Sequence, residues 1–582
     1  HVEMLSLSRN LVQSLSKSSL QSSAAASGVG LRHMASDMFC FQCEQTNEGT
    51  GCTTVGVCGK EPSTAALQDL LMASLKRLGF YYHGARSHAG IHLKEIDRFI
   101  MEASFSTLTN VNFDNDRMTH YITQSEQYVK QIMPVCPAED KVGLAAGLKT
   151  LDLPASMEGR IALGKKFGVL DRRSLLGEDV AGLQELLTYG FKGTAAYAYH
   201  ASAMGHEKEA IFEGLTKSLR QLAATEQSVD ALVGAAMEMG GLNLQTMGLL
   251  DAAHRSELGV PVPSQVNTSP VHGKCILVSG HDLHDLKDLL DQCVGTGVNV
   301  YTHGEMLPAH SYPELRKYRP LVGHYGGAWQ LQKIEFAHFP GPIIMTSNCV
   351  VEPRKKYADR IWSKNAVGFP GMHHLPGNDY SGIIAQAQSM TGWEKDEPEK
   401  WITTGFGREA VLGAAPLVLD LIGKGKLKDV FLIGGCDGSE GERSYFTEVA
   451  KNAPHESLIL TLGCGKFRMN SLDLGNIEGL PRLLDMGQCN DAFGAVQVAV
   501  GLAAALKTDV HSLPLHFVVS WFEQKAVAVL LTLLHLGIQD IRLGPALPAF
   551  VSPNVLAVLQ DQFKIKAIGD PKEDLKQMLA GH

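Results

Sequence analysis

Four cysteines lie close together near the start of the sequence, in the stretch CFQCEQTNEGTGCTTVGVC that runs from residue 40 to residue 58. They are Cys40, Cys43, Cys52 and Cys58, and two, eight and five residues separate them. Four thiolates at short spacing can hold a zinc ion tetrahedrally or carry an iron–sulfur cluster. The stretch therefore predicts a metal site of one of these two kinds.

The spacing of these cysteines favours the iron–sulfur cluster, although it leaves zinc open. Structural zinc sites usually use two close pairs of ligands with a longer gap between them. Here one close pair is followed by two separated cysteines in glycine-rich loops, which can wrap a larger inorganic body and bond to it through backbone N–H groups. The glycines are Gly49, Gly51, Gly56 and Gly59.

A second set of possible ligands follows short apolar runs in the later part of the chain. Such runs, ending in small residues and alternating with helical patterns, predict strands of parallel sheets. The carboxyl ends of parallel strands line the ligand crevice, so residues placed there can face one another. His281 follows ILVSG, Glu305 lies in VNVYTHGE, Cys349 follows PIIMTSN, Cys436 follows VFLIGG and Cys464 follows LILTLG, while Cys489 in LLDMGQCND and Glu523 in VVSWFEQKA follow strands less clearly.

Each of these residues alone has an ordinary structural interpretation. A glycine-flanked cysteine after a strand is most often a small buried hydrophobic residue, and a lone His or Glu is usually a hydrogen-bonded or surface group. The turns GGCDG and LGCGK could also cradle phosphate, but neither matches G-x-G-x-x-G. The repetition of the pattern favours one shared site.

The elements that must position these residues divide the chain into parts. Leu67, Leu70, Leu71, Leu75 and Leu78 repeat on one helical face, and similar patterns continue to about residue 257. The fold class we predict is multidomain, with an N-terminal helical-bundle domain followed by two Rossmann-like α/β domains with parallel sheets. The predicted boundaries are 38–263 for the cysteine motif and helical bundle, 264–390 and 391–582 for the α/β domains, and a proline-spaced linker at 259–273.

Composition excludes several classes of protein. Hydrophobic residues make up 45% of the 582 residues and charged residues 19%, as in an ordinary core-forming chain. A net charge of -9 argues against nucleic acid as a partner. The longest continuous apolar run, around 526–534, is too short to span a membrane. Eleven cysteines are too few for a disulfide scaffold in a chain of this length, so we expect a reducing compartment.

Residues 1–37 differ in composition from the rest. From Met4 to Ser36 there are many serines and a few basic residues, but no Asp or Glu. This composition is typical of an organelle transit peptide, and a disordered leader is the alternative. If it is a transit peptide, we expect a mitochondrial or plastid protein; otherwise the expected location is cytoplasmic.

From Met38 to the C-terminus the sequence resembles the hybrid cluster protein family, also called prismane protein or hydroxylamine reductase. The motifs that carry the resemblance occur in order along the chain. They are MFCFQCEQT, TNVNFD, GHDLHDL, YTHGEMLPA, SNCV, GGCDG, LGCGKFR, MGQCND, FEQKAVAVLL and LGPALPAFVSPNV.

The resemblance implies two metal centres. Cys40, Cys43, Cys52 and Cys58 match the cysteines that hold a 4Fe-4S cubane in the family. A hybrid 4Fe-2S-2O cluster is implied at the second site, and Cys436 matches the cysteine that can carry an extra sulfur as a persulfide. The implied ligands of the hybrid cluster are His281, Glu305, Cys349, Cys436, Cys464, Cys489 and Glu523, whereas Cys136, Cys275 and Cys293 match no ligand motif.

The resemblance also implies an iron–sulfur oxidoreductase that reduces hydroxylamine to ammonia and water. Candidates to supply protons are Glu305, His281, His303 and Lys525. On an extended segment, Lys525 and Glu523 would point to one side. Structural pairing is the alternative for His303 and Lys525.

Three other functions stay open at this point. The same site suits nitric oxide reduction to nitrous oxide. A nitric-oxide or redox sensor that modifies partners through Cys436 is a second alternative. A relative of carbon monoxide dehydrogenase is the third, against which Glu305 and Glu523 argue. The sequence shows no nicotinamide or flavin fingerprint, so we expect an external electron donor, either a ferredoxin or an NADH-dependent reductase.

Overall fold

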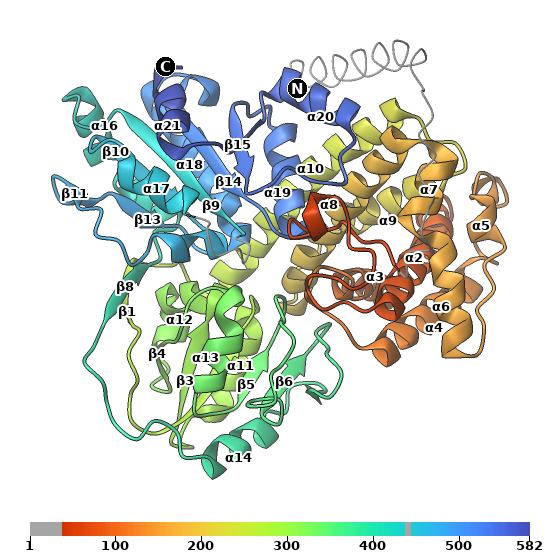
Figure 1. Ribbon diagram of the computed structural model, residues 1–582, viewed down its shortest axis with the longest axis horizontal. Helices are drawn as coiled ribbons and strands as arrows, with labels where there is room; N and C mark the ends of the chain where they lie inside the picture. Colours follow the sequence, from red (N-terminus) through yellow and green to blue (C-terminus); the bar gives the residue numbers. More distant parts are fainter. Residues whose placement is uncertain (1–37, 437–443, 582) are drawn as a thin grey trace.

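The computed structural model describes residues 38–436 and 444–581. The chain forms a helical part followed by two α/β parts, which can be told apart as distinct lobes in Figure 1. This arrangement confirms the predicted fold class, and the domain boundaries stay a prediction. The expectation of a transit peptide or leader at 1–37 lies outside the described residues.

The helical part is built on long helices that share an apolar core. The leucine stripe predicted at residues 67–78 is fully buried on the first of them. Two other long helices, α8 and α10, pack against each other and against α19 of the last part. The helices are α2 (Pro62–Ala89), α3 (Lys94–Ser106), α4 (Asn115–Ile132), α5 (Ala146–Lys149), α6 (Met157–Gly164), α7 (Val169–Leu176), α8 (Glu178–Ala203), α9 (Glu209–Ala223) and α10 (Val229–Leu258).

The first α/β part contains a parallel sheet in the order β4-β3-β2-β5-β6-β7. Its strands are β2 (Lys274–Ser279), β3 (Val298–His303), β4 (Leu321–His324), β5 (Ile343–Met345), β6 (Ile361–Lys364) and β7 (His373–Leu375). The helices of this part are α11 (Leu283–Cys293), α12 (Pro313–Arg316), α13 (Gln332–His338) and α14 (Ser381–Ser389).

The second α/β part contains a parallel sheet in the order β13-β10-β9-β14-β15-β16. Its strands are β9 (Asp429–Gly435), β10 (Ser457–Thr461), β13 (Leu483–Asp485), β14 (Leu515–Ser520), β15 (Ile541–Gly544) and β16 (Lys566–Ala567), and a small hairpin is formed by β11 (Asn476–Ile477) and β12 (Leu480–Pro481). The helices are α15 (Arg408–Gly413), α16 (Ala415–Gly423), α17 (Tyr445–Asn452), α18 (Ala492–Leu506), α19 (Gln524–His535), α20 (Pro553–Phe563) and α21 (Pro571–Ala580).

One detail of the sequence-based picture is wrong. The predicted linker at 259–273 contains a strand, β1 (Ser264–Asn267), which pairs antiparallel with β8 (Trp401–Thr404) beside both α/β parts (Figure 1). Among the described residues, Cys489–Leu506 is long and apolar enough to cross a membrane by length and composition, but 44% of it is buried within the protein. Asn490, Asp491 and Gln497 interrupt it, so it is not a continuous apolar run.

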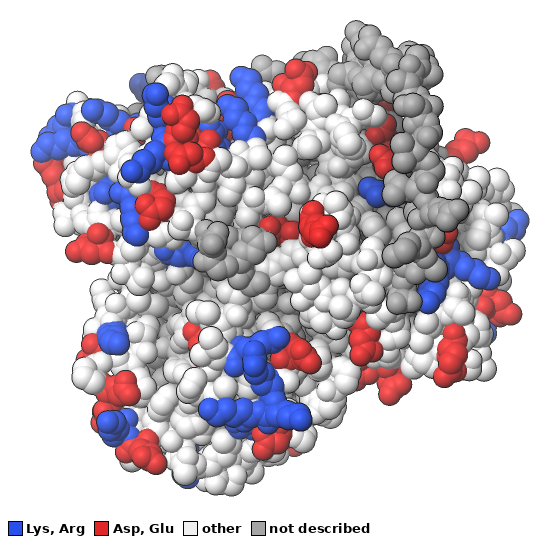
Figure 2. All heavy atoms as spheres, in the orientation of Figure 1, with Lys and Arg blue, Asp and Glu red and all other residues white. Residues whose placement is uncertain are grey.

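Surface charge is mixed on the face seen in Figure 2. Lys and Arg side chains lie among Asp and Glu side chains there, over both the helical and the α/β parts. This view shows no broad basic surface on that face, in keeping with the net charge of -9.

The predicted ligands follow the ends of neighbouring strands. His281, Glu305 and Cys349 follow β2, β3 and β5, which are adjacent in the first sheet. In the second sheet, four adjacent strands β13, β10, β9 and β14 precede the other four ligands in turn: Cys489, Cys464, Cys436 and Glu523. The expected link between strand ends and ligand positions therefore extends to Cys489 and Glu523.

A close backbone approach at Gly435 fixes where β9 delivers Cys436. The φ of Gly435 is +119°, a conformation that side-chain-bearing residues rarely adopt, and a Cβ there would lie 2.1 Å from the carbonyl oxygen of Ser520 on β14. Any side chain at this position would push apart two strands that carry site residues.

We predict that Gly435→Ala lowers the thermal unfolding midpoint by about 5 °C or more, because it adds both backbone strain and a steric clash. The matched control is Gly423→Ala at the end of α16, where a Cβ would meet nothing within 4 Å. Thermal denaturation followed by circular dichroism measures both variants. Equal midpoints for the two variants would contradict the prediction.

Candidate metal centre

The seven residues expected at the second site line a single cavity. It lies where the carboxyl ends of the two parallel sheets meet, and its donor groups are four thiols, two carboxyl groups and an imidazole. Three further residues complete the wall. The lining residues are His281, Glu305, Cys349, Cys436, Cys464, Cys489 and Glu523, together with Trp329, Asn348 and Phe522.

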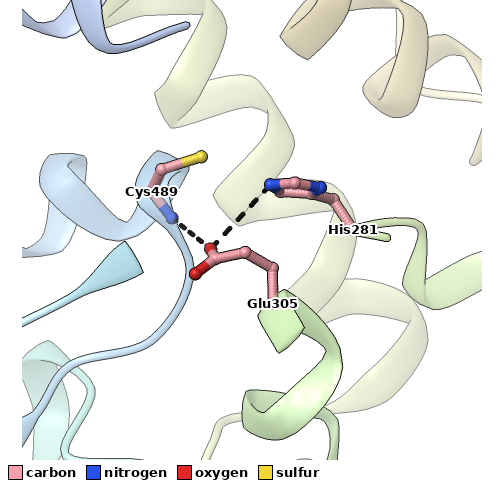
Figure 3. A group of neighbouring side chains, drawn as sticks. All are labelled: His281, Glu305 and Cys489. Atoms are coloured by element: carbon pink, nitrogen blue, oxygen red, sulfur yellow. Dashed lines mark hydrogen bonds and ion pairs between the residues drawn. The ribbon is translucent and has the colours of Figure 1, made fainter. Parts of the chain in front are cut away.

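Three of these groups are close enough to share one metal ion. Ligand atoms of His281, Glu305 and Cys489 all lie within 4.8 Å of one another. Nε2 of His281 is 4.0 Å from Oε2 of Glu305, and the backbone N–H of Cys489 donates to the same oxygen at 3.1 Å. Figure 3 shows the imidazole, the carboxylate and the thiol gathered from three separate segments.

A side chain that the sequence analysis did not single out ties the two sheets together at this point. Nε2 of Gln488 donates to the backbone carbonyl of Glu305 at 2.8 Å and to that of His281 at 2.9 Å. Gln488 is buried and immediately precedes Cys489. One amide group therefore sets the positions of three neighbouring ligands across the boundary between the two α/β parts.

Burial disfavours the anionic forms of the thiols and carboxyl groups in this cavity. Burial, together with repulsion from the nearby carboxylates and thiolates, raises the pKa values of Cys436 and Cys464 well above the usual thiol value. Burial also raises the pKa of Cys489 to about 12 and raises the pKa values of Glu305 and Glu523. The anionic forms need positive charge nearby, which a metal centre supplies when it binds deprotonated ligands.

The hydrogen bonds of His281 leave one ring nitrogen for a metal. Nδ1 lies 3.1 Å from the carbonyl oxygen of Asn348, which can only accept, so Nδ1 carries the proton. Nε2 is then the unprotonated nitrogen, and it faces Glu305. Metal-bound histidines commonly have their other ring nitrogen held in this way.

Glu305 also has an atom suited to a metal. Its Oε1 is buried and has no hydrogen-bond partner among the described residues. An unpaired buried carboxylate oxygen is costly unless a cation meets it. With thiolates for sulfide-bridged iron and carboxylate oxygens for oxygen-bridged iron, the donor set fits a mixed iron–sulfur–oxygen centre.

Lys525 lies behind the cavity wall. On an extended segment, Lys525 and Glu523 would point to one side, but Lys525 lies in the first turn of helix α19. Glu523 caps this helix by accepting from the Lys525 backbone N–H at 2.9 Å. Its buried Nζ donates to Oδ1 of Asn348 at 2.6 Å. Lys525 therefore reaches the cavity through Asn348.

The structure does not bring His303 to the cavity wall. Its Nδ1 lies 2.9 Å from Oγ of Ser279, and its Nε2 lies 2.9 Å from Oε2 of Glu335. Both ring nitrogens are thus engaged by partners away from the seven-residue set. These contacts explain the burial of His303 without a direct role in chemistry.

The four front cysteines gather in the loop before α2. The backbones of Cys40 and Cys52 form an isolated antiparallel β-bridge. None of the four cysteines forms a disulfide. Burial raises the pKa of Cys43, and the neighbouring thiols of Cys40, Cys58 and Cys52 raise it further. A Cβ at Gly56 would lie 3.0 Å from Sγ of Cys58, so the absence of a side chain leaves room beside that thiol.

The front loop packs directly against the cavity. Cys43 belongs to the same buried cluster as Cys349, Cys464 and Phe522. The backbone N–H of Glu44 donates to the carbonyl oxygen of Phe522 at 3.1 Å. The four-cysteine loop and the seven-residue cavity are therefore neighbours. Phe522 lines the cavity and also contacts the loop.

Tyr197 is a further residue of the site that sequence reasoning missed. Its hydroxyl donates to Sγ of Cys489 at 3.2 Å from helix α8. Neither its spacing nor its neighbours in the sequence, AAYAYHA, distinguish it from a core aromatic residue. The MGQCND motif drew attention to Cys489 but not to the role of Gln488.

Known proteins are similar to this chain over most of its length. Residues 38–576 match the Prismane/CO dehydrogenase family. A hydroxylamine reductase of Zymomonas mobilis is 49% identical over 544 residues, which cover 93% of this chain and 99% of that protein. Hydroxylamine reductases of Burkholderia ambifaria and Escherichia coli are each 48% identical, over 553 and 550 residues, with 93% of this chain covered and 99% and 100% of theirs.

Solved structures share the fold at low sequence identity. Carbon monoxide dehydrogenase IV from Carboxydothermus hydrogenoformans superimposes with a TM-score of 0.52 at 15% identity, covering 98% of this chain and 97% of that one. A nickel-free carbon monoxide dehydrogenase from Thermococcus sp. AM4 gives a TM-score of 0.51 at 16% identity, covering 93% and 90%. This likeness concerns the architecture alone.

We predict that Tyr197→Phe lowers the reduction potential of the metal centre in the cavity. A hydrogen bond to a ligating sulfur stabilises the more negative reduced state, so its loss disfavours reduction. The control, Tyr318→Phe, removes a hydroxyl that bonds to Asp291 away from the cavity. A redox titration followed by electron paramagnetic resonance measures both variants. An unchanged or raised potential in Tyr197→Phe would contradict the role assigned to this hydroxyl.

Proposed function

This chain belongs to the Prismane/CO dehydrogenase family, and we propose that it reduces hydroxylamine to ammonia and water. The reaction consumes two electrons and two protons: NH2OH + 2e⁻ + 2H⁺ → NH3 + H2O. The observation that carries the proposal is the convergence of seven metal-binding side chains in one buried cavity. The hydroxylamine reductases that are 48–49% identical over nearly their whole length support it.

The proposed cofactors are two iron–sulfur centres. Cys40, Cys43, Cys52 and Cys58 would hold a 4Fe-4S cluster, and the seven residues of the cavity would hold a hybrid 4Fe-2S-2O cluster. When bound, the hybrid cluster supplies electrons and an open coordination position for the substrate oxygen or nitrogen. Cys436, whose Sγ lies 3.9 Å from Oε1 of Glu523, is the proposed position for a persulfide.

The chain's own groups would manage the protons. Glu305 lines the cavity, and burial raises its pKa, so its protonated form can hand a proton to the departing oxygen. His281 presents its unprotonated Nε2 to the cavity, which suits a metal ligand rather than a proton donor. The ammonium of Lys525 holds Oδ1 of Asn348 and so orients the amide at the wall. His303 contacts Ser279 and Glu335, neither of which lines the cavity, so structural pairing suits it better than proton supply.

Two aromatic rings would limit the access of water. Trp329 and Phe522 stack with ring centroids 4.4 Å apart, and both line the cavity. An apolar wall of this kind strengthens the electrostatic effect of the charged ligands, because water does not screen them. It also favours small, weakly charged substrates such as hydroxylamine.

Electrons would enter through the front cysteines. We propose that an external donor, a ferredoxin or an NADH-dependent reductase, docks near the front loop. The shared cluster of Cys43, Phe522, Cys349 and Cys464 then provides a short packed route to the cavity. Nitric oxide reduction and a sensor role stay predictions, since no contact in the cavity favours them over hydroxylamine reduction.

We predict that Glu305→Gln lowers hydroxylamine turnover by about 100-fold while the front cluster keeps its iron. The amide keeps the side-chain shape and an acceptor for the Cys489 N–H, but it loses the anionic ligand and the proton donor. The control is Glu314→Gln at an exposed position on α12. Ammonia production with a chemical reductant, together with iron analysis, measures the effect.

Two results would overturn this assignment. One is wild-type turnover in Glu305→Gln with an unchanged electron paramagnetic resonance spectrum. The other is a wild-type protein, loaded with iron under anaerobic conditions, that produces no ammonia from hydroxylamine.

A further inference from the structure

A second, larger cavity lies inside the helical part, apart from the seven-residue site. Its volume is about 370 Å³, in the range of pockets that hold small organic ligands. Helices α2, α5, α7 and α8 and the front loop form most of its walls. Apolar side chains such as Met72, Leu148 and Phe167 supply much of the surface.

This mostly apolar cavity also contains an excess of positive charge. Four cationic side chains and two carboxylates line its inner walls, and an exposed lysine, Lys166, lies at its rim. Most of the inner cations have a partner. Arg172 lies 2.7 Å from Oε1 of Glu185, Nζ of Lys60 donates to Sγ of Cys40 at 3.6 Å, and Nζ of Lys192 donates to Oε1 of Gln42 at 3.4 Å.

Lys76 is the exception. Among residues 38–436 and 444–581, it has neither a hydrogen-bond partner nor an ion-pair partner, and its relative exposure is 9%. The carboxylate of Asp69, which lies seven residues earlier on α2 and also lines the cavity, does not pair with it.

Burying an ammonium group without a partner costs free energy, and this cost lowers the pKa of the group. Burial is the largest cause that lowers the pKa of Lys76 to about 7, and the neighbouring cations Arg172 and Lys192 lower it further, while Glu185 and Asp69 oppose them. A negatively charged group placed beside Lys76 would remove the cost. An unpaired donor aimed into a cavity of ligand size therefore points to an anionic ligand.

We propose that this cavity binds a small organic anion, with its acid group at Lys76 and its apolar body against Met72, Leu148 and Phe167. The ligand class is a carboxylate with a short apolar chain or ring. None of its residues lines the seven-residue cavity, so the site lies apart from the place where hydroxylamine would bind. Since Cys40 also lines it, the ligand would sit beside the front thiols.

Isothermal titration calorimetry of the cluster-loaded protein with octanoate tests the proposal. Octylammonium and 1-octanol carry the same chain with a positive charge and with no charge. We expect octanoate to bind at one site at least tenfold more tightly than either control compound. Equal binding of all three, or no octanoate binding at millimolar concentration, would overturn the proposal.

Variants locate the binding at Lys76. Lys76→Met keeps the length of the side chain and removes the charge, so we expect it to weaken octanoate binding by about tenfold or more, the effect of losing a charged hydrogen bond. Lys76→Arg should retain most of the affinity, and Lys130→Met, at an exposed position on α4, should retain all of it. Octanoate binding that is unchanged in Lys76→Met contradicts the site.

The folding of the variants does not limit this test. Replacing an unpaired buried charge with an apolar side chain of similar size tends to stabilise a protein. If circular dichroism shows that Lys76→Met is unfolded, the comparison of Lys76→Arg with the wild type and the three compounds on the wild type still decide between the outcomes. Hydroxylamine turnover plays no part in these measurements, so failure here leaves the proposed reaction untouched.

Discussion

Four thiols, two carboxyl groups and an imidazole are buried around one cavity, and the two sheets, the front loop and the nearby hydrogen bonds must all be arranged to hold them there. Burial raises the pKa values of Cys436, Cys464 and Glu523, and repulsion from neighbouring anionic groups raises those of the two thiols further. Burial lowers the pKa of His281, so the charged forms of all these groups are unfavourable for the protein alone. The surrounding polar contacts reduce that cost where they can. Cys489 receives a hydrogen bond from Tyr197, and Glu305 receives one from the backbone of Cys489.

The fold meets this constraint by opposing two parallel sheets. Three adjacent strands of one sheet and four adjacent strands of the other end at the cavity, so every ligand comes from a loop that a buried strand holds in place. Gln488 joins the two sets by bonding to the carbonyl groups of His281 and Glu305. The helical part and the front loop close the remaining side, through the contact of Glu44 with Phe522.

Sequence reasoning predicted the parts of this arrangement that depend on local pattern. The apolar runs before His281, Glu305, Cys349, Cys436 and Cys464 are strands, and the leucine stripe at residues 67–78 is a buried helix face. The contacts of Gln488, Tyr197 and Asn348 could not be predicted, because their partners lie far away in the sequence. Local pattern also failed at β1, because the prolines on either side of it suggested a linker, and at Lys525, which belongs to a helix that Glu523 caps.

If the proposed function is right, the cavity and the front cysteines are two iron sites. Anomalous X-ray diffraction on anaerobically grown crystals, recorded on both sides of the iron absorption edge, can locate the iron. We expect iron peaks among Cys40, Cys43, Cys52 and Cys58 at the ~2.3 Å typical of metal–thiolate bonds, and a second group of iron peaks within the cavity beside His281 and Glu305. A zinc signal at the front cysteines, or a cavity without iron in protein that reduces hydroxylamine, would contradict this expectation.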